Sequence, residues 1–308
     1  MDEKFQIIAL GCTGGPREGN LTSYLLSPLA DQEWIALDAG SLLTGIDLAI
    51  EKNNLMGVAF TDTKLTAAGE MVVKHLRCYL ISHTHLDHIA GLVLNSQIDE
   101  NKYILGIDPT IDNLRDFIFN GRIWPNFGNE GSEPILRRYE YIRLPLYKQR
   151  EIPNTSMSVE AYLLSHPDGY PSTAFLIEHK GHYLLYFGDT SSDLHEEEKH
   201  LAHIWHRIAP LLKEKKMQGM LLECSYPQQF SDQVKFGHLD TKLMIQELHH
   251  LSEIAEVSLE GFKVIVTHRK ESLKKGSDAT ALIKEELLAM NDLGVHFLFP
   301  SQGDRLIL

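Results

Sequence analysis

Apolar and polar positions along the chain follow two alternating patterns. Short apolar runs bounded by glycine, aspartate or serine are typical of buried strands, and segments with apolar side chains every three or four positions are typical of amphipathic helices. Strands are predicted at 5–10, 21–27, 33–37, 77–81, 102–107, 157–164, 172–178, 182–187, 218–222 and 262–266, with two more near Val295 and Arg305. Helices are predicted at 41–52, 87–95, 108–120, 196–216, 240–251 and 278–290. Because strands alternate with helices from end to end, the pattern predicts a layered α/β domain.

Residues 81–91, with the sequence ISHTHLDHIAG, form the most distinctive stretch of the chain. They place His83, His85, Asp87 and His88 within six positions. Neutral imidazole and carboxylate groups are ligands that suit zinc, iron or manganese. The stretch lies where a predicted strand ends and a predicted helix begins, which is a usual location for ligands in an open α/β sheet. We therefore predict that the first two histidines hold one metal ion, while Asp87 and His88 reach a second.

Four later strands also end in residues of ligand type, namely His166, Asp189, Glu223 and His268. In the predicted arrangement, His83, His85 and His166 bind one ion, and Asp87, His88 and His268 bind the other. Asp189 and a hydroxide bridge the two ions. Two dications, together with the negative charges of Asp87, Asp189 and the hydroxide, leave the site with a net charge of about +1, which would attract a phosphodiester monoanion. Two ions about 3.5–4 Å apart suit in-line displacement at phosphorus. Zn²⁺ is the first expectation, and Mn²⁺ and Fe²⁺ accept the same ligands.

The composition of the chain limits its partners. A formal net charge of −13 disfavours a broad surface for nucleic acid. The three cysteines, Cys12, Cys78 and Cys224, are widely spaced and fit a reducing compartment. The first residues lead directly into a strand, without the pattern of a signal peptide or a membrane span. We expect a cytoplasmic protein that acts on a small molecule, without stable nucleic-acid or membrane partners, and a homodimer is an open alternative to a monomer.

Two irregular stretches are candidates for contact with a substrate. The loop 11–16, GCTGGP, lacks the spacing of a phosphate-binding loop. It is either only a tight turn or a segment that passes close to the metal site, with Thr13 as a candidate substrate contact. The stretch 121–131 holds Trp124 and Phe127. It is either a surface loop pinned by its aromatic side chains or a loop in which one of these rings faces a planar base.

Several motifs together resemble those of one family. They are LGCTGGP at 10–16, SHTHLDHIAG at 82–91, IWPN at 123–126, GDT at 188–190, LECSYP at 222–227 and GHL at 237–239. The whole chain is similar to the class II cyclic-nucleotide phosphodiesterases, which have the metallo-β-lactamase fold. The motif at 83–88 and the later His166, Asp189 and His268 match the metal motifs of that fold in order. The chain departs from the family at 269–271, where Arg-Lys-Glu stands in place of the frequent Ile-Lys-Pro.

The resemblance implies an α/β structure, a metallo-β-lactamase-like four-layer αββα sandwich. It implies one domain over residues 1–308, with a substrate-loop insertion at about 108–150. It further implies two divalent metal ions and hydrolysis of 3′,5′-cyclic AMP or GMP to the 5′-monophosphate by attack of a metal-bridging hydroxide. Asp87 is then both a metal ligand and a catalytic residue.

Departure of the ribose 3′-oxygen requires a proton donor, because an alkoxide is a poor leaving group. His238 is the best candidate, since it opens a helix and the ligand count is filled by other histidines. Glu223, at a strand end, can accept a hydrogen bond from its ring and favour the imidazolium form. Alternatively, His238 only caps its helix and Glu223 is a buried ion-pair partner.

Two other functions remain open at this point. The first is that of the related tRNA 3′-end endonuclease, ribonuclease Z, which shares the metal ligands and the paired Glu and His. That enzyme needs a basic surface or arm for tRNA, and this acidic chain has no basic run. The second is nucleotide binding with metals that are only structural. Metal-dependent turnover distinguishes an enzyme from such a binding protein.

Overall fold

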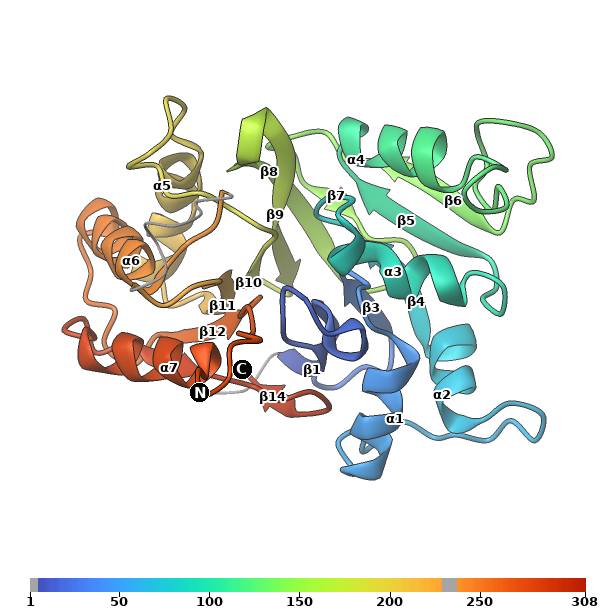
Figure 1. Cartoon of the computed structure of the whole chain (residues 1–308), viewed down its shortest axis with the longest axis horizontal. Helices are drawn as coiled ribbons and strands as arrows, with labels where there is room; N and C mark the ends of the chain where they lie inside the picture. The colour runs from blue at the N-terminus through green and yellow to red at the C-terminus, as the bar shows by residue number, and fades with distance from the viewer. Residues whose placement is uncertain (1–4, 229–236) are drawn as a thin grey trace.

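Two seven-stranded β-sheets face each other across a shared apolar core, and helices cover the outer face of each sheet (Figure 1). This computed structural model describes residues 5–228 and 237–308. Residues 1–4, which the sequence placed directly before the first strand, lie outside the described residues. The order of layers, helices, sheet, sheet and helices, confirms the predicted αββα sandwich.

The first sheet has the strand order β14-β1-β2-β3-β4-β5-β6. Its strands are β1 (Phe5–Gly11), β2 (Ser23–Pro28), β3 (Trp34–Leu37), β4 (Leu76–Leu80), β5 (Lys102–Gly106), β6 (Tyr139–Arg143) and β14 (Arg305–Ile307). Neighbouring side chains of β1 point to opposite faces, so that Ile7 packs between the sheets and Ile8 packs under the helices. Since both faces are buried, the strand is apolar throughout rather than alternating.

The second sheet has the strand order β13-β12-β11-β10-β9-β8-β7. Its strands are β7 (Arg150–Glu151), β8 (Ser158–His166), β9 (Tyr170–His179), β10 (His182–Phe187), β11 (Met217–Glu223), β12 (Lys263–Thr267) and β13 (His296–Leu298). The predicted hairpin joins β9 to β10 through Lys180 and Gly181, whose φ angles are 49° and 79°. Two consecutive positive φ angles are typical of the tight hairpin turn that matches the twist of the strands.

Helices on the two outer faces form separate apolar cores with the sheets. Against the first sheet lie α1 (Leu43–Glu51), α2 (Ala67–Glu70), α3 (Leu86–Asn95) and α4 (Asp108–Asn113), and single π-helical turns follow α2 and α4 at Met71–His75 and Leu114–Ile118. Against the second sheet lie α5 (His200–Lys213), α6 (Thr241–Ala255) and α7 (Ala279–Ala289). Short 3₁₀ turns stand at Glu18–Asn20 and Pro167–Gly169.

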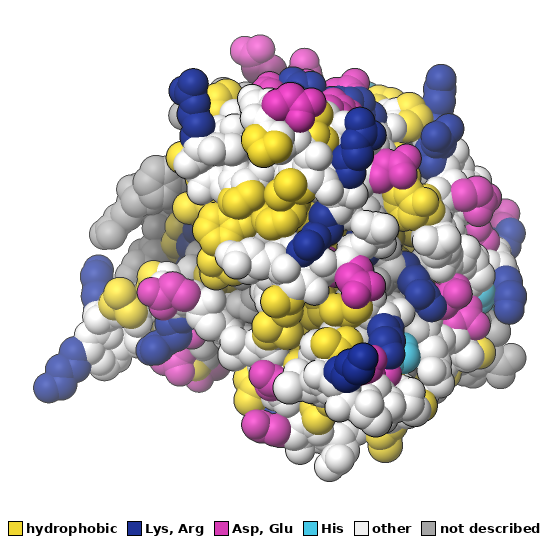
Figure 2. Space-filling model, turned by 90° about the vertical axis from the view of Figure 1, so that its right-hand side faces the viewer, with side chains coloured by type: hydrophobic (Ala, Val, Ile, Leu, Met, Phe, Trp, Pro, Cys, Tyr) yellow, Lys and Arg dark blue, Asp and Glu magenta, His cyan; other side chains and the backbone are white. Residues whose placement is uncertain are grey.

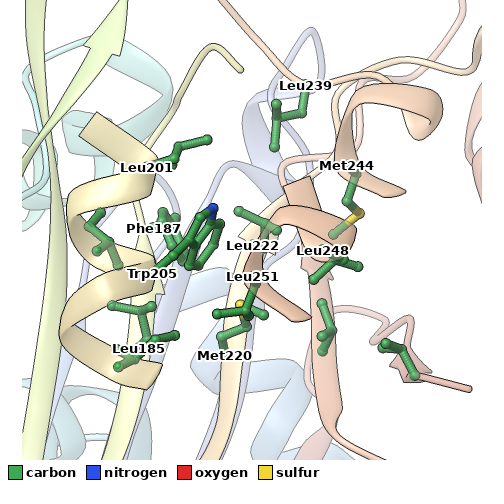
Figure 3. Packing of buried hydrophobic residues seen from close by; sticks show 14 of the residues in the cluster. Leu185, Phe187, Leu201, Trp205, Met220, Leu222, Leu239, Met244, Leu248 and Leu251 are labelled. Carbon is green, nitrogen blue, oxygen red and sulfur yellow. The ribbon is translucent and has the colours of Figure 1, made fainter. Parts of the chain in front are cut away.

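Trp205 of α5 is a central side chain of the outer core on the second sheet. Its ring lies 5.6 Å from that of Phe187 on β10, and Figure 3 shows both between the helices, with Leu222 and Leu248 close by. The neighbouring helix α6 starts at Asp240, whose carboxylate accepts a hydrogen bond from Leu243 N at 2.7 Å. This N-cap fixes where the helix begins.

Several elements differ from the sequence prediction. The predicted helix at 196–216 begins only at His200, because the Asp193 carboxylate accepts hydrogen bonds from Leu201 N and Ala202 N and so caps the helix there. Strands β6 and β7 were not predicted. β6 is the edge strand beside β5, and it gave no continuous apolar run because only Tyr139 and Tyr141 are buried. Among the described residues, no helix is long and apolar enough to cross a membrane.

Candidate active site

The predicted metal ligands come together from both sheets. His83 and His85 follow β4, Asp87 and His88 lie in the first turn of α3, His166 ends β8, Asp189 follows β10 and His268 follows β12. The Asp189 carboxylate lies among them: its Oδ2 is 3.2 Å from His268 Nε2, 3.7 Å from His83 Nε2 and 3.8 Å from His166 Nε2, and its Oδ1 is 3.3 Å from His88 Nε2. A cluster of this kind forms because strands of both sheets end at the same edge.

Two groups of side chains have ligand atoms close enough to share an ion, with all atoms of a group within 4.8 Å of one another. The first group is His83, His85, His166 and Asp189, and the second is Asp87, His88 and His268. This is the division that the sequence predicted. Asp189 also lies beside His268, in a third combination that includes His238, so its carboxylate is placed between the two groups.

Buried atoms that lack hydrogen bonds show that these side chains fit a metal. His83 Nε2, His88 Nε2 and Asp189 Oδ1 are buried and have no hydrogen-bond partner within the described part of the chain. A buried polar atom without a partner costs about 1–3 kcal/mol. Coordination of a cation would satisfy all three atoms, because each is an acceptor aimed into the cluster.

Four of the histidines are oriented from outside the cluster. Their Nδ1–H groups donate to Ser82 Oγ (His83, 3.0 Å), Asp38 Oδ2 (His88, 2.8 Å), Gly237 O (His166, 2.9 Å) and Ser225 Oγ (His268, 2.9 Å). With the proton on Nδ1, each ring presents the lone pair of Nε2 to the cluster. Outer partners of this kind fix the tautomer and the ring direction of metal ligands.

Sequence reasoning missed Asp38, which follows β3 and is fully buried. Its carboxylate accepts hydrogen bonds from Ser82 N and Ser82 Oγ, both at 2.7 Å, from Tyr186 OH at 2.6 Å and from His88 Nδ1 at 2.8 Å. The one signal in the sequence was that Asp38 follows a strand, as the predicted ligands do. Its role depends on partners that lie far away in sequence.

His238 and Glu223 form the predicted pair beside the ligands. His238 Nδ1 donates to Glu223 Oε1 at 2.9 Å and lies 3.7 Å from Asp189 Oδ2. Glu223 is held in turn by Thr190 N at 3.0 Å and Ser225 Oγ at 2.8 Å. The helix that follows is capped by Asp240 rather than by His238, so the alternative that His238 serves as the helix cap is wrong.

Burial shifts the pKa values of these groups. Burial lowers the pKa of His166 to about 3 and that of His238 to about 4. Burial and the neighbouring Asp189 raise the pKa of Glu223 to about 8. Burial thus disfavours the charged form of each group, and the imidazolium form of His238 stays a prediction. Since the two groups share a hydrogen bond, their titration belongs to the pair.

Phe127 and Trp124, which were predicted as substrate contacts, are buried and half-buried, respectively. Phe127 is only 7% exposed and packs in the outer core of the first sheet, with its edge toward Phe119 and with the Arg138 guanidinium over its ring. A base cannot stack on a ring so covered, and the predicted role of Phe127 is corrected to packing. Trp124 is half-buried and donates from Nε1 to Ser96 Oγ at 2.9 Å, which pins the loop to the end of α3.

The loop after β1 does reach one of the predicted metal ligands, His268. A Cβ atom on Gly14 would lie 2.1 Å from Cε1 of His268, so this backbone passes directly against the ligand ring. Thr13 is 4% exposed, and its hydroxyl donates to Asn20 O at 2.8 Å. Thr13 thus shapes the loop, and a contact between Thr13 and a substrate stays a prediction, as does one between Trp124 and a base.

The sandwich and its histidine- and aspartate-lined edge define a protein of the metallo-β-lactamase fold. A metallo-β-lactamase-fold protein of Bacillus subtilis, YhfI, superposes with a TM-score of 0.62 at 15% identity over 99% of this chain and all of the other. The chain belongs to the family described as class II cAMP phosphodiesterases, whose profile matches residues 4–303.

Individual relatives cover nearly the whole chain. A 3′,5′-cyclic-nucleotide phosphodiesterase of Aliivibrio fischeri is 36% identical over 98% of this chain and 92% of its own length. The crystal structure of unliganded yeast PDE1 superposes with a TM-score of 0.83 at 25% identity, over 99% of this chain and 100% of that one.

Proposed function

We propose that this chain hydrolyses 3′,5′-cyclic AMP, cyclic GMP or both to the 5′-monophosphate with two divalent metal ions. The proposal rests chiefly on the convergence of two ligand groups on Asp189, beside the His238–Glu223 pair, in a chain of the class II family. Zn²⁺ is our first assignment for both ions, and Mn²⁺ or Fe²⁺ would accept the same donors.

Each part of the site has a distinct task. The first ion would be held by His83, His85 and His166 and the second by Asp87, His88 and His268, with Asp189 shared. When bound, two such ions supply an activated water and neutralise charge on the phosphoryl oxygens. His238 is placed beside the ligands to give a proton to the departing ribose 3′-oxygen, and Glu223 holds the direction of its ring.

A panel of substrates tests the proposal. Purified protein with defined metals is assayed with cyclic AMP, cyclic GMP, 2′,3′-cyclic nucleotides, bis(p-nitrophenyl) phosphate and precursor tRNA. We expect 5′-AMP from cyclic AMP, lost on metal removal, and no cleavage of precursor tRNA. Cleavage of tRNA alone would favour the ribonuclease Z reading. The absence of any turnover would favour a nucleotide-binding protein.

The charge of the protein surface supports a small substrate rather than a nucleic acid. Figure 2 shows basic and acidic side chains interspersed on one face, and the net charge of the chain is −13. We further propose a cytoplasmic location, which the three buried, unpaired cysteines support. A homodimer stays a prediction that analytical ultracentrifugation can test.

A further inference from the structure

His85 differs from the other ligand histidines in how its ring is held. His83, His88, His166 and His268 are buried, and each donates a hydrogen bond from Nδ1 to an outer partner. His85 is half-buried, and its Nδ1 points inward, 3.3 Å from His166 Nε2. No described residue hydrogen-bonds to its outer nitrogen, Nε2. Within residues 5–228 and 237–308, His85 thus has no counterpart of the hydrogen bond that normally orients a metal-bound imidazole.

An aromatic ring takes the place of that hydrogen bond. Tyr170, the first residue of β9, stacks on His85 with ring centroids 4.6 Å apart and planes inclined by 19°. Its hydroxyl lies 2.6 Å from Thr84 Oγ1 and accepts a hydrogen bond from Asn113 Nδ2 at 3.2 Å. These contacts anchor the tyrosine to the metal motif and to α4. The tyrosine ring is thus fixed from two sides and presents a flat face to the imidazole.

We propose that Tyr170 is a positioning residue that orients His85 for the metal ion bound by His83, His85 and His166. Rotation of the His85 ring would break the stack, so the tyrosine restricts the ring much as a hydrogen-bonded carboxylate restricts other ligands. The anchor on Asn113 further links the segment after β5 to this ion. The inference rests on the proposed metal site.

Metal release from Tyr170→Leu and Tyr170→Phe tests the inference without an activity assay. Tyr170 is only half-buried and lines an open cavity of about 450 Å³, so its truncation leaves no sealed void. Protein loaded with two Co²⁺ ions is mixed with a chromophoric chelator, and release and the visible Co²⁺ spectrum are recorded. Tyr183→Leu is the matched control, because Tyr183 is a half-buried strand tyrosine that contacts Arg207 instead.

We expect Tyr170→Leu to weaken the binding of one of the two ions about 10–100-fold, the usual effect of losing an outer partner, and so to release that ion faster. The second ion and the Tyr183→Leu control should behave like the parent. Tyr170→Phe keeps the stacked ring and loses only the hydroxyl contacts, so it should release the first ion more slowly than Tyr170→Leu. Parental release from Tyr170→Leu, equal acceleration of both ions, or a Tyr170→Phe variant as fast as Tyr170→Leu would overturn the role of the ring. A parent protein that binds no metal would instead contradict the proposed metal site.

Discussion

His238 is the residue that should control departure of the leaving group. Replacing it with alanine removes the proton donor but none of the seven assigned metal ligands. We expect His238→Ala to lower kcat for cyclic AMP by about 10²–10⁴-fold. Hydrolysis of a p-nitrophenyl diester should change far less, because that leaving group departs without a proton. His203→Ala, at an exposed histidine of α5, is the control. Equal losses with both substrates, or loss of metal, would contradict the assignment.

Asp38 should act on the metal through His88. Asparagine has the same size and tolerates the φ of 52° at this position, but its amide cannot accept all the hydrogen bonds that Asp38 accepts. We expect Asp38→Asn to weaken metal binding by about 10–100-fold in competition with a chelator. Asp99→Asn is the matched control, because Asp99 is a buried carboxylate that accepts from Tyr79 and Tyr139. It should lower Tm and leave the metal affinity unchanged. Unchanged affinity in Asp38→Asn would remove Asp38 from the site.

The outcomes at single residues show where sequence reasoning is effective. The clustered side chains in 83–88 could be proposed as ligands because they are close in sequence, and the later ones because each lies at a strand end. Asp38 and Tyr170 were missed as supports because their partners are long-range: Asp38 and His88 are 50 positions apart, and Tyr170 and Thr84 are 86 apart. Phe127 was misjudged because an irregular segment gives no indication of which of its aromatic rings is buried.

At the scale of elements, a glycine in the loop after β1 lets the backbone approach the site closely. Gly14 lies against the ring of His268, which is itself buried and held by Ser225. We expect Gly14→Ala to displace this ligand and to weaken metal binding by about tenfold or more. Gly19→Ala provides the control, since a Cβ atom there meets nothing within 4 Å. Normal metal binding by Gly14→Ala would mean that the loop moves and His268 keeps its position.

The segment after α4 should matter for stability rather than for affinity. Phe127→Ala opens a void in the outer core of the first sheet, and such truncations cost about 3–5 kcal/mol of unfolding free energy. The KM for cyclic AMP should stay unchanged in the folded variant. Phe117→Ala is the control, because Phe117 is 66% exposed, and a surface change of this kind alters stability by about 0.5 kcal/mol or less. A higher KM with normal stability would restore the predicted base contact.

The pattern of apolar residues predicted most of the other helices and strands, and the exceptions have physical causes. The hairpin around Lys180 and Gly181 was predictable, because its turn residues and flanking apolar runs agree. β6 was not, because the exposed Glu140 interrupts its apolar residues Tyr139, Tyr141 and Ile142, so that they form no continuous run. The start of α5 depends on a capping carboxylate outside the helix, Asp193, which periodicity does not reveal.

At the scale of the whole molecule, the site exists only where the two sheets meet. β3, β4 and α3 of the first half supply Asp38, His83, His85, Asp87 and His88, and β8, β10, β11 and β12 of the second half supply His166, Asp189, Glu223 and His268. Each of the two predicted ligand groups takes residues from both halves. The ions would therefore connect the halves, and their binding should stabilise the packed sandwich.

The most direct test is a titration of metal-stripped protein with Zn²⁺, in which formation of 5′-AMP from cyclic AMP is followed against the number of ions added per chain. The stripped protein should be inactive, and the rate should rise until about two ions are bound per chain and then level off. Activity without metal, a plateau at one ion, or full metal binding without 5′-AMP would contradict a cyclic-nucleotide phosphodiesterase built on two ions.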